Sequence, residues 1–206
     1  MPFVLYVETN FLMSVAMGRE PHGDDLLTAI SRDFRVVIPT GCYMEAFSAF
    51  EHELKKRNRF KGAIDEQISD SGRDKTSENA KRLLANLEQS RMDNDRWLND
   101  IQERLINYID KVIPEFEQLQ ITPVIVRKSV SEILISDPTD YLILHSILDD
   151  AIKRPEDTKV MLTGNTSDFL KPDVKIALRE VGVPKPLTRA FDALGALKEW
   201  EKLRGS

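Results

Sequence analysis

Three short apolar runs constrain the fold of this chain more than any other feature of its sequence. They span Phe3 to Val7, Arg35 to Ile38 and Lys159 to Thr163, and each is nearly continuous in apolar residues. Strands of a parallel sheet have this character because helices cover both of their faces. The runs therefore predict buried parallel strands. Gln120 to Thr122 and Val181 to Val183 are weaker strand candidates.

Helical periodicity fills the stretches between these strands. The predicted helices span residues 9–17, 24–33, 41 to about 59, 124–135, 139–153 and 172–181. Strands that alternate with helices imply right-handed crossovers and a largely parallel sheet. Ligands of such sheets collect at the carboxyl ends of the strands, so residues that follow the strands are the first candidates for a functional site.

A long amphipathic stretch interrupts this alternation. Between Ser77 and Gln118, apolar residues recur mostly every three or four positions, which predicts a long helix that Pro114 kinks or stops. With the polar segment 62–77 as a linker, we expect a helical hairpin inserted at about residues 50–118. Because 206 residues are too few for two ordinary enzyme domains side by side, we expect one domain over residues 1–206.

The composition narrows the class of protein. Apolar residues make up 41% of the chain and charged residues 31%, which is typical of a globular protein. No stretch approaches transmembrane length, and Cys42, the only cysteine, cannot form an intramolecular disulfide. We therefore expect a cytoplasmic protein with no membrane contact. The formal charge of −5 does not favour a nucleic-acid partner, but carboxylates gathered around a metal ion would also contribute to it.

Acidic side chains follow the first two predicted strands. Glu8 comes directly after the first strand, and Glu45 falls in the first turn or so of the helix after the second. Both positions lie at the carboxyl edge of the predicted sheet. Each acid also has a plain alternative role, which is to stabilise a helix N-terminus as a cap or through the helix dipole.

Two later segments offer further oxygen ligands. Asp140 lies at the start of an apolar helix, where Asp137 is the better candidate for the cap. The strand that ends at Thr163 leads into a turn with Asn165 and Asp168, which alone also describe an ordinary turn and cap. A buried acid needs a partner, and a metal ion is one solution. An acidic cluster without Cys or His ligands fits Mg²⁺ or Mn²⁺ better than zinc.

In order and context, these residues resemble the motifs of PIN domains. The resemblance rests on Glu8-Thr9-Asn10, Glu45, Asp140 and the segment from Thr163 to Phe169, and it spans nearly the whole chain apart from the helical insertion. It implies an α/β fold, a PIN-like three-layer α/β/α sandwich with a central, mainly parallel sheet and an inserted long helical hairpin. It also implies an endoribonuclease that uses Mg²⁺ or Mn²⁺ to hydrolyse phosphodiester bonds of RNA.

The resemblance also assigns roles to individual residues. It gives metal ligation to Glu8, Glu45, Asp140, Asn165 and Asp168, with the four acids as catalytic residues, and supporting roles to Asn10 and Thr163. Two positions depart from the family pattern. Glu8 stands where PIN domains typically have an aspartate, and its side chain is longer. Asn165 stands where many have an acid and offers only a neutral carbonyl, which shifts the ligand role toward Asp168.

A basic run is the candidate contact for nucleic acid, at the expected end of the first hairpin arm. It consists of Lys55, Lys56, Arg57, Arg59 and Lys61. The alternative is a solvated helix end whose cations suit the C-terminal dipole. No base-reading module is visible, so the expected partner, single-stranded or structured RNA, rests on the resemblance.

Protein partners and a second function class also remain open. An antitoxin or another protein is a candidate partner, and the hairpin is a candidate surface for a homodimer. The main alternative function is a PIN-like domain that has lost catalysis and acts as an RNA-binding or protein-interaction module. The departures at Glu8 and Asn165 are its evidence.

Overall fold

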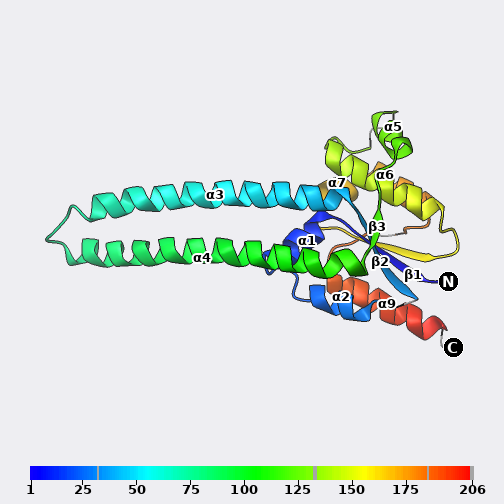
Figure 1. The fold of residues 1–206 in the computed structure, drawn as a ribbon, viewed down its shortest axis with the longest axis horizontal. Coiled ribbons are helices and arrows are strands. Elements are labelled where there is room, and N and C mark those ends of the chain that lie inside the picture. Colours follow the sequence, from blue (N-terminus) through cyan, green and yellow to red (C-terminus); the bar gives the residue numbers. More distant parts are fainter. Residues whose placement is uncertain (32, 132–133, 185, 205–206) are drawn as a thin grey trace.

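The fold is built around a central parallel sheet (Figure 1). The computed structural model describes residues 1–31, 33–131, 134–184 and 186–204. Within them, five strands pair in the order β3-β2-β1-β4-β5, all parallel. The strands are β1 (Phe3–Val7), β2 (Phe34–Pro39), β3 (Glu117–Leu119), β4 (Thr158–Leu162) and β5 (Pro186–Leu187). The sheet therefore confirms the predicted parallel α/β architecture.

Strand β1 lies at the centre of the sheet, and the direction of the strand order reverses there. The chain adds β2 and β3 on one side of β1 and then β4 and β5 on the other. Val7 is paired with Leu162 across the β1–β4 pair. The residues that follow these two strands, Glu8 and Thr163, are therefore neighbours at a switch point, which is where parallel sheets bind ligands.

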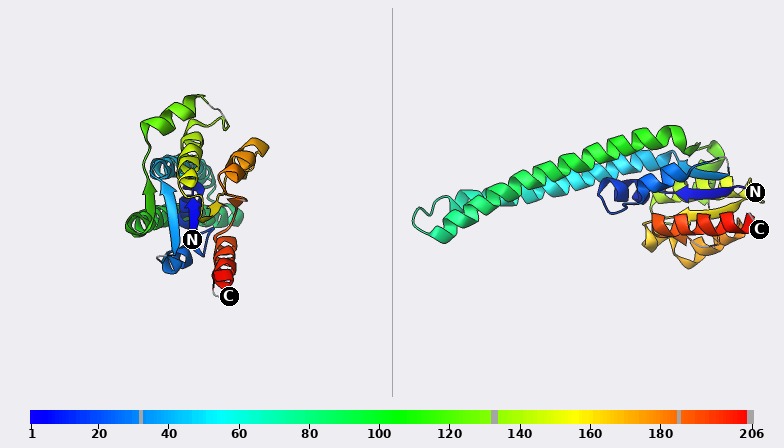
Figure 2. Two further views of the ribbon diagram at one scale, coloured as in Figure 1. Left: turned by 90° about the vertical axis from the view of Figure 1, so that its right-hand side faces the viewer. Right: turned by 90° about the horizontal axis from the view of Figure 1, so that it is seen from below.

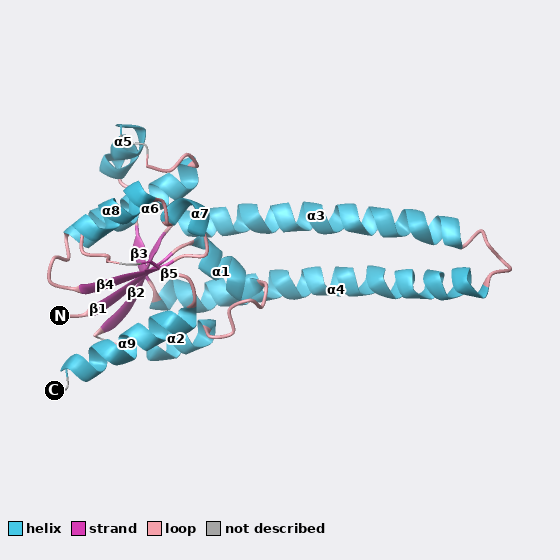
Figure 3. Cartoon of the chain, turned by 180° about the vertical axis from the view of Figure 1, so that it is seen from behind, coloured by secondary structure: helices cyan, strands magenta, loops and turns pink. Residues whose placement is uncertain are grey.

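Helices cover both faces of the sheet (Figure 3). On one face lie α6 (Pro138–Ile152) and α8 (Pro172–Glu180), and on the other lie α2 (Gly23–Ala29) and α9 (Ala190–Arg204). The remaining short helices are α1 (Thr9–Ala16), α5 (Pro123–Ser131) and α7 (Thr166–Phe169). This arrangement confirms the three-layer sandwich. The core is continuous from β1 through both helical layers.

Two long helices form a hairpin that projects from the sheet (Figures 1 and 2). They are α3 (Gly41–Ser71) and α4 (Glu78–Glu115). At the base, Tyr108 of α4 donates a hydrogen bond of 2.9 Å to the carbonyl of Gly23. Farther out, Lys61 and Asp95 form an ion pair of 2.7 Å between the two arms. The predicted hairpin is thus present, and its base is anchored beside the carboxyl edge of the sheet.

The first arm of the hairpin is longer than the sequence predicted. Residues 62–71 were expected to belong to a linker but continue α3, and the turn between the arms is confined to residues 72–77. Ile64 is buried against the second arm, so burial outweighs the modest helix cost of Gly62. Pro114 lies in the last turn of α4, which confirms that it marks the stop of this helix.

Two weak strand predictions were wrong, and two helices, α7 and α9, were missed. The segment Gln120–Thr122 follows β3 rather than forming it, since β3 pairs through Glu117–Leu119. The segment Val181–Val183 ends α8, where Gly182 has φ +82° and the amides of Gly182 and Val183 bond back to the helix, a Schellman cap. Helix α9 was not predicted, although Ala193, Leu197 and Trp200 recur at helical spacing.

The other helices agree with prediction to within a few residues at their ends. The predicted ranges 24–33 and 124–135 include residues 32 and 132–133, which lie outside the described residues. Among the described helices, none is both long enough and apolar enough to cross a membrane.

Candidate metal centre

Glu8 lies at the point where β1 gives way to α1, and its side chain is fully buried. Oε2 accepts a hydrogen bond of 2.8 Å from the backbone N–H of Asn10, which caps α1. Oε1 accepts another of 2.8 Å from the backbone N–H of Gly164, beyond β4. The cap predicted as an alternative role is therefore real, and the same carboxylate also joins the ends of two central strands. Asn10 thus supports Glu8 through its backbone N–H, whereas the sequence suggested a role for its side chain.

Glu45 lies one turn into α3 and points toward the start of α1. Its Oε2 accepts a short hydrogen bond from the hydroxyl of Thr9, which is buried. Oε1 accepts no hydrogen bond from the described residues. Thr9, the residue next to Glu8, thus links Glu45 to the start of α1, and one carboxylate oxygen of Glu45 remains available.

Asp140 lies in the first turn of α6 and is 6% exposed. The cap of α6 is Asp137, as the sequence suggested, and its Oδ1 accepts from the backbone N–H groups of Thr139 at 2.8 Å and Asp140 at 3.2 Å. The Asp140 carboxylate is therefore not consumed in capping. Its Oδ2 accepts a hydrogen bond of 2.8 Å from the side-chain amide of Asn165, and no described residue donates to Oδ1.

Asn165 caps the short helix α7 and connects two acids. Its Oδ1 accepts from the hydroxyl of Ser167 at 2.7 Å and from the backbone N–H of Asp168 at 3.2 Å. Its Nδ2 donates to Asp140 at 2.8 Å and to Asp168 Oδ2 at 3.1 Å. The carbonyl that we expected to face a metal ion is thus used in the cap, and the amide faces the acids. Thr163 accepts from the backbone N–H of Asn165 at 3.1 Å.

Asp168 is already paired with a cation. Its Oδ1 accepts from the ammonium group of Lys171 at 2.6 Å, and this bond holds the pKa of Asp168 below its usual value. Both carboxylate oxygens of Asp168 therefore already accept hydrogen bonds, Oδ1 from Lys171 and Oδ2 from Asn165. Asp168 is therefore less available to a metal ion than Glu45 or Asp140, each of which has one carboxylate oxygen without a donor among the described residues.

The three other acids are difficult to ionise together. Burial raises the pKa of Glu8 to about 6, and the charge of Glu45 adds to the rise. Burial likewise raises the pKa of Asp140 to about 7, with further contributions from the charges of Glu45, Asp137, Glu8 and Asp168. The pKa of Glu45 is raised too, mainly by burial. Such mutual effects require the carboxylates to be near one another, and a bound cation would relieve them.

The donor set suits a hard cation that keeps water ligands. In the part of the chain that the structure describes, no group of three or more His, Cys, Asp or Glu side chains is arranged to hold a metal ion. However, Asp140 Oδ1 and Glu45 Oε1 are carboxylate oxygens without a hydrogen-bond donor among the described residues. Mg²⁺ commonly takes one or two carboxylates and fills its remaining positions with water and substrate oxygens, so these residues fit it.

The predicted basic run lies away from the acids, inside α3 instead of at its end. Most of its cations are neutralised within the hairpin. Lys55 pairs with Glu51, Lys56 and Arg57 pair with Glu53, Lys61 pairs with Asp95, and Arg59 donates to the carbonyl of Lys55. Arg57 also lies 3.7 Å from the centroid of the Trp97 ring. The run therefore supports the hairpin more directly than it offers charge to nucleic acid.

Three residues of the site were not identified from the sequence. Thr9 was quoted only as part of the motif, Gly164 only as a turn residue, and Lys171 not at all. For Lys171 a signal existed, because a lysine three residues after an acid is a common ion-pair spacing on a helix. The contact of Gly164 with Glu8 joins residues far apart in the sequence and becomes visible only with the strand register.

Gly164 leads to a prediction about stability. A Cβ atom at this position would lie 2.9 Å from Cβ of Asn10, a distance that two backbone-anchored atoms cannot tolerate. We expect Gly164→Ala to lower the free energy of unfolding by about 1–3 kcal/mol, because the backbone must shift and loosen the hydrogen bond to Glu8. Chemical denaturation measures this change. Gly62→Ala, at a position with open space around the new atom, is the control and should not destabilise the protein.

Comparison with known proteins agrees with this geometry. The sequence profile of the PIN domain family matches residues 5–169, which runs from β1 through α7 and includes each acid described above. No curated protein and no solved structure shows significant similarity to the chain. The matched segment covers most of the sequence and contains the parallel sheet core, the hairpin and the buried acids. This chain belongs to the PIN domain family.

Proposed function

We propose that this protein is a metal-dependent ribonuclease that hydrolyses phosphodiester bonds of RNA through Mg²⁺ or Mn²⁺ bound at the acid cluster. The observation that carries the proposal is the pair of carboxylate oxygens, one on Glu45 and one on Asp140, that accept no hydrogen bond from the described residues. They belong to one half-buried and one buried acid near the switch point of a parallel sheet, and members of the PIN domain family are generally nucleases.

Each residue of the cluster has a distinct part in this proposal. Glu45 and Asp140 would hold the metal ion, and Glu8 would add negative charge while fixing the ends of β1 and β4. Asn165 would keep the Asp140 carboxylate in place through its amide. Lys171 would keep Asp168 paired and in place beside Asn165. When bound, the metal ion lowers the pKa of a water molecule and neutralises charge on the phosphate.

A second function class has support from specific observations. Asp168 is neutralised by Lys171, and the described acids do not form a complete three-residue metal site. The hairpin also exposes large apolar side chains, including Phe60 and Trp97. These features would suit a PIN domain with weakened catalysis that binds RNA or a protein partner such as an antitoxin or a second copy of the chain.

A metal titration separates the two proposals. If the acid cluster binds Mn²⁺, millimolar ion should raise the melting temperature by several degrees, because binding to the native state alone adds about 2.7 kcal/mol at one hundred times the dissociation constant. Differential scanning fluorimetry measures the shift, with Ca²⁺ and Mg²⁺ in parallel. Single-stranded RNA incubated with the same protein should be cleaved only when Mn²⁺ or Mg²⁺ is present.

The outcomes differ clearly. A melting temperature that is unchanged by millimolar Mn²⁺, together with intact RNA, would favour the binding module over the nuclease.

We also propose that the protein acts in the cytoplasm, where RNA is accessible. The single cysteine, Cys42, is buried and unpaired, which suits a reducing compartment.

A further inference from the structure

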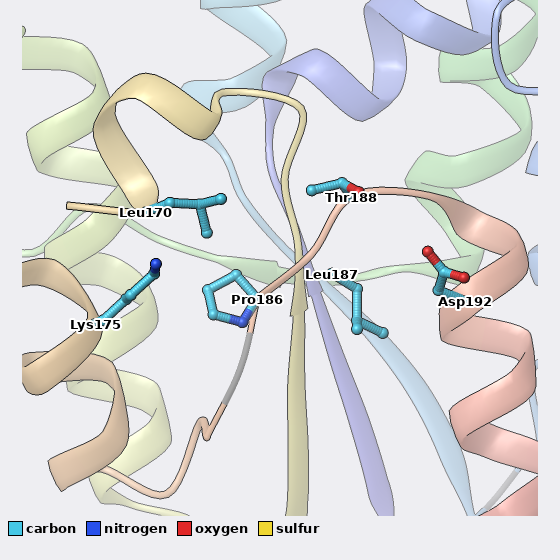
Figure 4. Close-up of a pocket in the computed structure, with 6 residues that line it drawn as sticks. All are labelled: Leu170, Lys175, Pro186, Leu187, Thr188 and Asp192. Carbon is cyan, nitrogen blue, oxygen red and sulfur yellow. The ribbon is translucent and has the colours of Figure 1, made fainter. Parts of the chain in front are cut away.

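Two adjoining hollows lie beyond the acid cluster, at the carboxyl end of β5. The first, of about 460 Å³, lies between α8 and α9, with Lys175 on one side and Asp192 on the other (Figure 4). The second, of about 630 Å³, lies between the end of α1 and the start of α9 and is lined by Arg19 and Arg189. Thr188 lines both hollows, so they adjoin along one side of the molecule. We call them together the edge groove.

The groove begins beside the candidate metal centre. Leu170, which lines the first hollow, follows Asp168 by two residues, and the next residue, Lys171, is bonded to that acid. The second hollow is lined by Ser14 of α1, the helix that begins at Thr9 next to Glu8. Elements that carry the acids therefore also form the walls of the groove.

The groove carries an excess of positive charge, with three cations and two acids along its lining. Lys175, Arg19 and Arg189 are exposed, and among the described residues none of their side chains takes part in an ion pair or a hydrogen bond. Of the two acids, Glu20 accepts a hydrogen bond of 3.0 Å from the backbone N–H of Ala190, which fixes its position and leaves its charge in place. The hairpin cations, by contrast, are mostly paired with acids.

An exposed aromatic ring adjoins these cations. Phe191 lines the second hollow and is 64% exposed, although a phenyl side chain at the start of a helix has no local reason to face solvent. Its ring lies 5.6 Å from that of His22, tilted by 49°, so the ring is supported on one side. Unpaired cations along a groove, together with an accessible aromatic ring, are the features by which proteins hold single-stranded nucleic acid.

We infer that the edge groove binds a single strand of nucleic acid, with Arg19 and Arg189 on its phosphates and one base stacked on Phe191. The inference rests on the proposed function, because it names the substrate class of the same site. The groove begins beside Asp168, which Asn165 connects to Asp140 of the candidate metal centre. A duplex would not meet the requirement, since its bases are stacked inside the helix and are not available to Phe191.

Binding measured without divalent metal tests this inference separately from cleavage. The probe is a fluorescein-labelled 12-nucleotide RNA of mixed sequence without self-complementarity, titrated with the full chain in EDTA and followed by fluorescence anisotropy. We expect the double variant Arg19→Ala/Arg189→Ala to bind about tenfold more weakly at 0.1 M salt. Its plot of log affinity against log salt should be shallower by about 1.4, since each phosphate contact with a single strand contributes about 0.7.

Variants of Phe191 test the stacked base. Phe191→Ala should weaken binding about fivefold or more, whereas Phe191→Trp should bind at least as well as the wild-type protein, because a larger ring retains the stacking surface. A matched charge control is Lys55→Ala/Lys56→Ala, which also removes two cations from an exposed surface but lies in the hairpin. Its affinity should stay within about twofold of wild type. The replaced side chains are all exposed, and melting curves check that each variant is folded.

Three results would overturn the inference. They are unchanged affinity in the double arginine variant, an equal loss in the hairpin control, and a duplex of the same sequence that binds as tightly as the single strand. Failure of the proposed function gives a different pattern, in which the wild-type protein binds the strand through Arg19 and Arg189 but does not cleave it with Mn²⁺. Cleavage with Mn²⁺ that is unaffected by the arginine and Phe191 variants would reject the groove and leave the nuclease proposal in place.

Discussion

Replacement of Asp140 by Asn is expected to lower Mn²⁺-dependent RNA cleavage by about two to three orders of magnitude, since the charge stabilisation of a metal-assisted reaction amounts to several kcal/mol. Asn keeps the shape of the side chain, and its carbonyl can still accept the hydrogen bond from Asn165 that the carboxylate accepts at 2.8 Å. The variant therefore removes the charge and little else. Initial rates on single-stranded RNA at saturating Mn²⁺ measure the loss.

The same substitution should make the metal-free protein more stable at pH 8. Burial raises the pKa of Asp140 from 3.8 to about 7, so the folded protein holds this proton more tightly than the unfolded chain. Stability from this group is therefore greatest below about pH 4 and falls as the pH rises toward 7, where the folded protein must also release the proton. Each unit of such a shift corresponds to about 1.4 kcal/mol. At pH 8, Asp140→Asn avoids the cost of a buried charge, and its melting temperature in EDTA should exceed that of wild type by several degrees.

Asp137→Asn is the matched control for this prediction. Asp137 is an exposed acid that caps α6, and Asn is an equally good cap, so cleavage should change by less than about threefold. Near pH 4, where Asp140 is protonated in the folded protein, Asp140→Asn and wild type should melt at similar temperatures. Cleavage by Asp140→Asn at the wild-type rate would show that another group holds the metal ion or that a different nuclease was measured.

The sequence predicted the position of the acid cluster because strand ends are the most constrained part of a parallel sheet. Glu8 follows the central strand and Thr163 follows its neighbour, so the strand order alone brings their surroundings together. Asp140 could be placed because Asp137 is the better cap, which leaves the next acid free to face the cluster. At these positions, the rules for strand ends and helix caps predict the same placement of the side chains that the fold shows.

The partners of individual side chains could not be predicted in the same way. Asn165 carries both a donor and an acceptor, and only the positions of Asp140 and Asp168 decide that its amide faces the acids. The basic run was a candidate contact for RNA because of its charge, and the pairing of Lys61 with Asp95, on the other arm of the hairpin, could not be foreseen. That pairing depends on how the two helices align, and the sequence pattern does not specify it.

The shortest elements also could not be predicted from pattern. Strand β5 consists of two residues and β3 of three, and both lie at the edges of the sheet. Edge strands need less apolar surface, so Glu117 can take part in β3 without an apolar run. The edge groove depends on β5 as well, since Thr188 directly follows it, and so no feature of the sequence indicated the groove.

Asn165→Asp is expected to have the second large effect, because it restores an acid where many PIN domains have one. Asp remains a good cap for α7, but the two amide donations, to Asp140 at 2.8 Å and to Asp168 at 3.1 Å, are lost. Hydrogen bonds to charged groups contribute about 1.5–3 kcal/mol each, so the metal-free variant at pH 8 should lose about 3 kcal/mol or more of unfolding free energy. Urea denaturation in EDTA measures the loss.

In the presence of Mn²⁺ the variant should recover part of this lost stability, because the added carboxylate is a better ligand for a hard cation than an amide. We expect the Mn²⁺ concentration at half-maximal stabilisation to fall by about tenfold, which corresponds to about 1.4 kcal/mol. Asn165→Ala is the control, since it also loses the donors but adds no charge, and it should be destabilised without any gain in affinity for Mn²⁺. If Asn165→Asp and Asn165→Ala respond to Mn²⁺ alike, position 165 does not face the metal ion, and the amide serves only to hold Asp140 and Asp168 together.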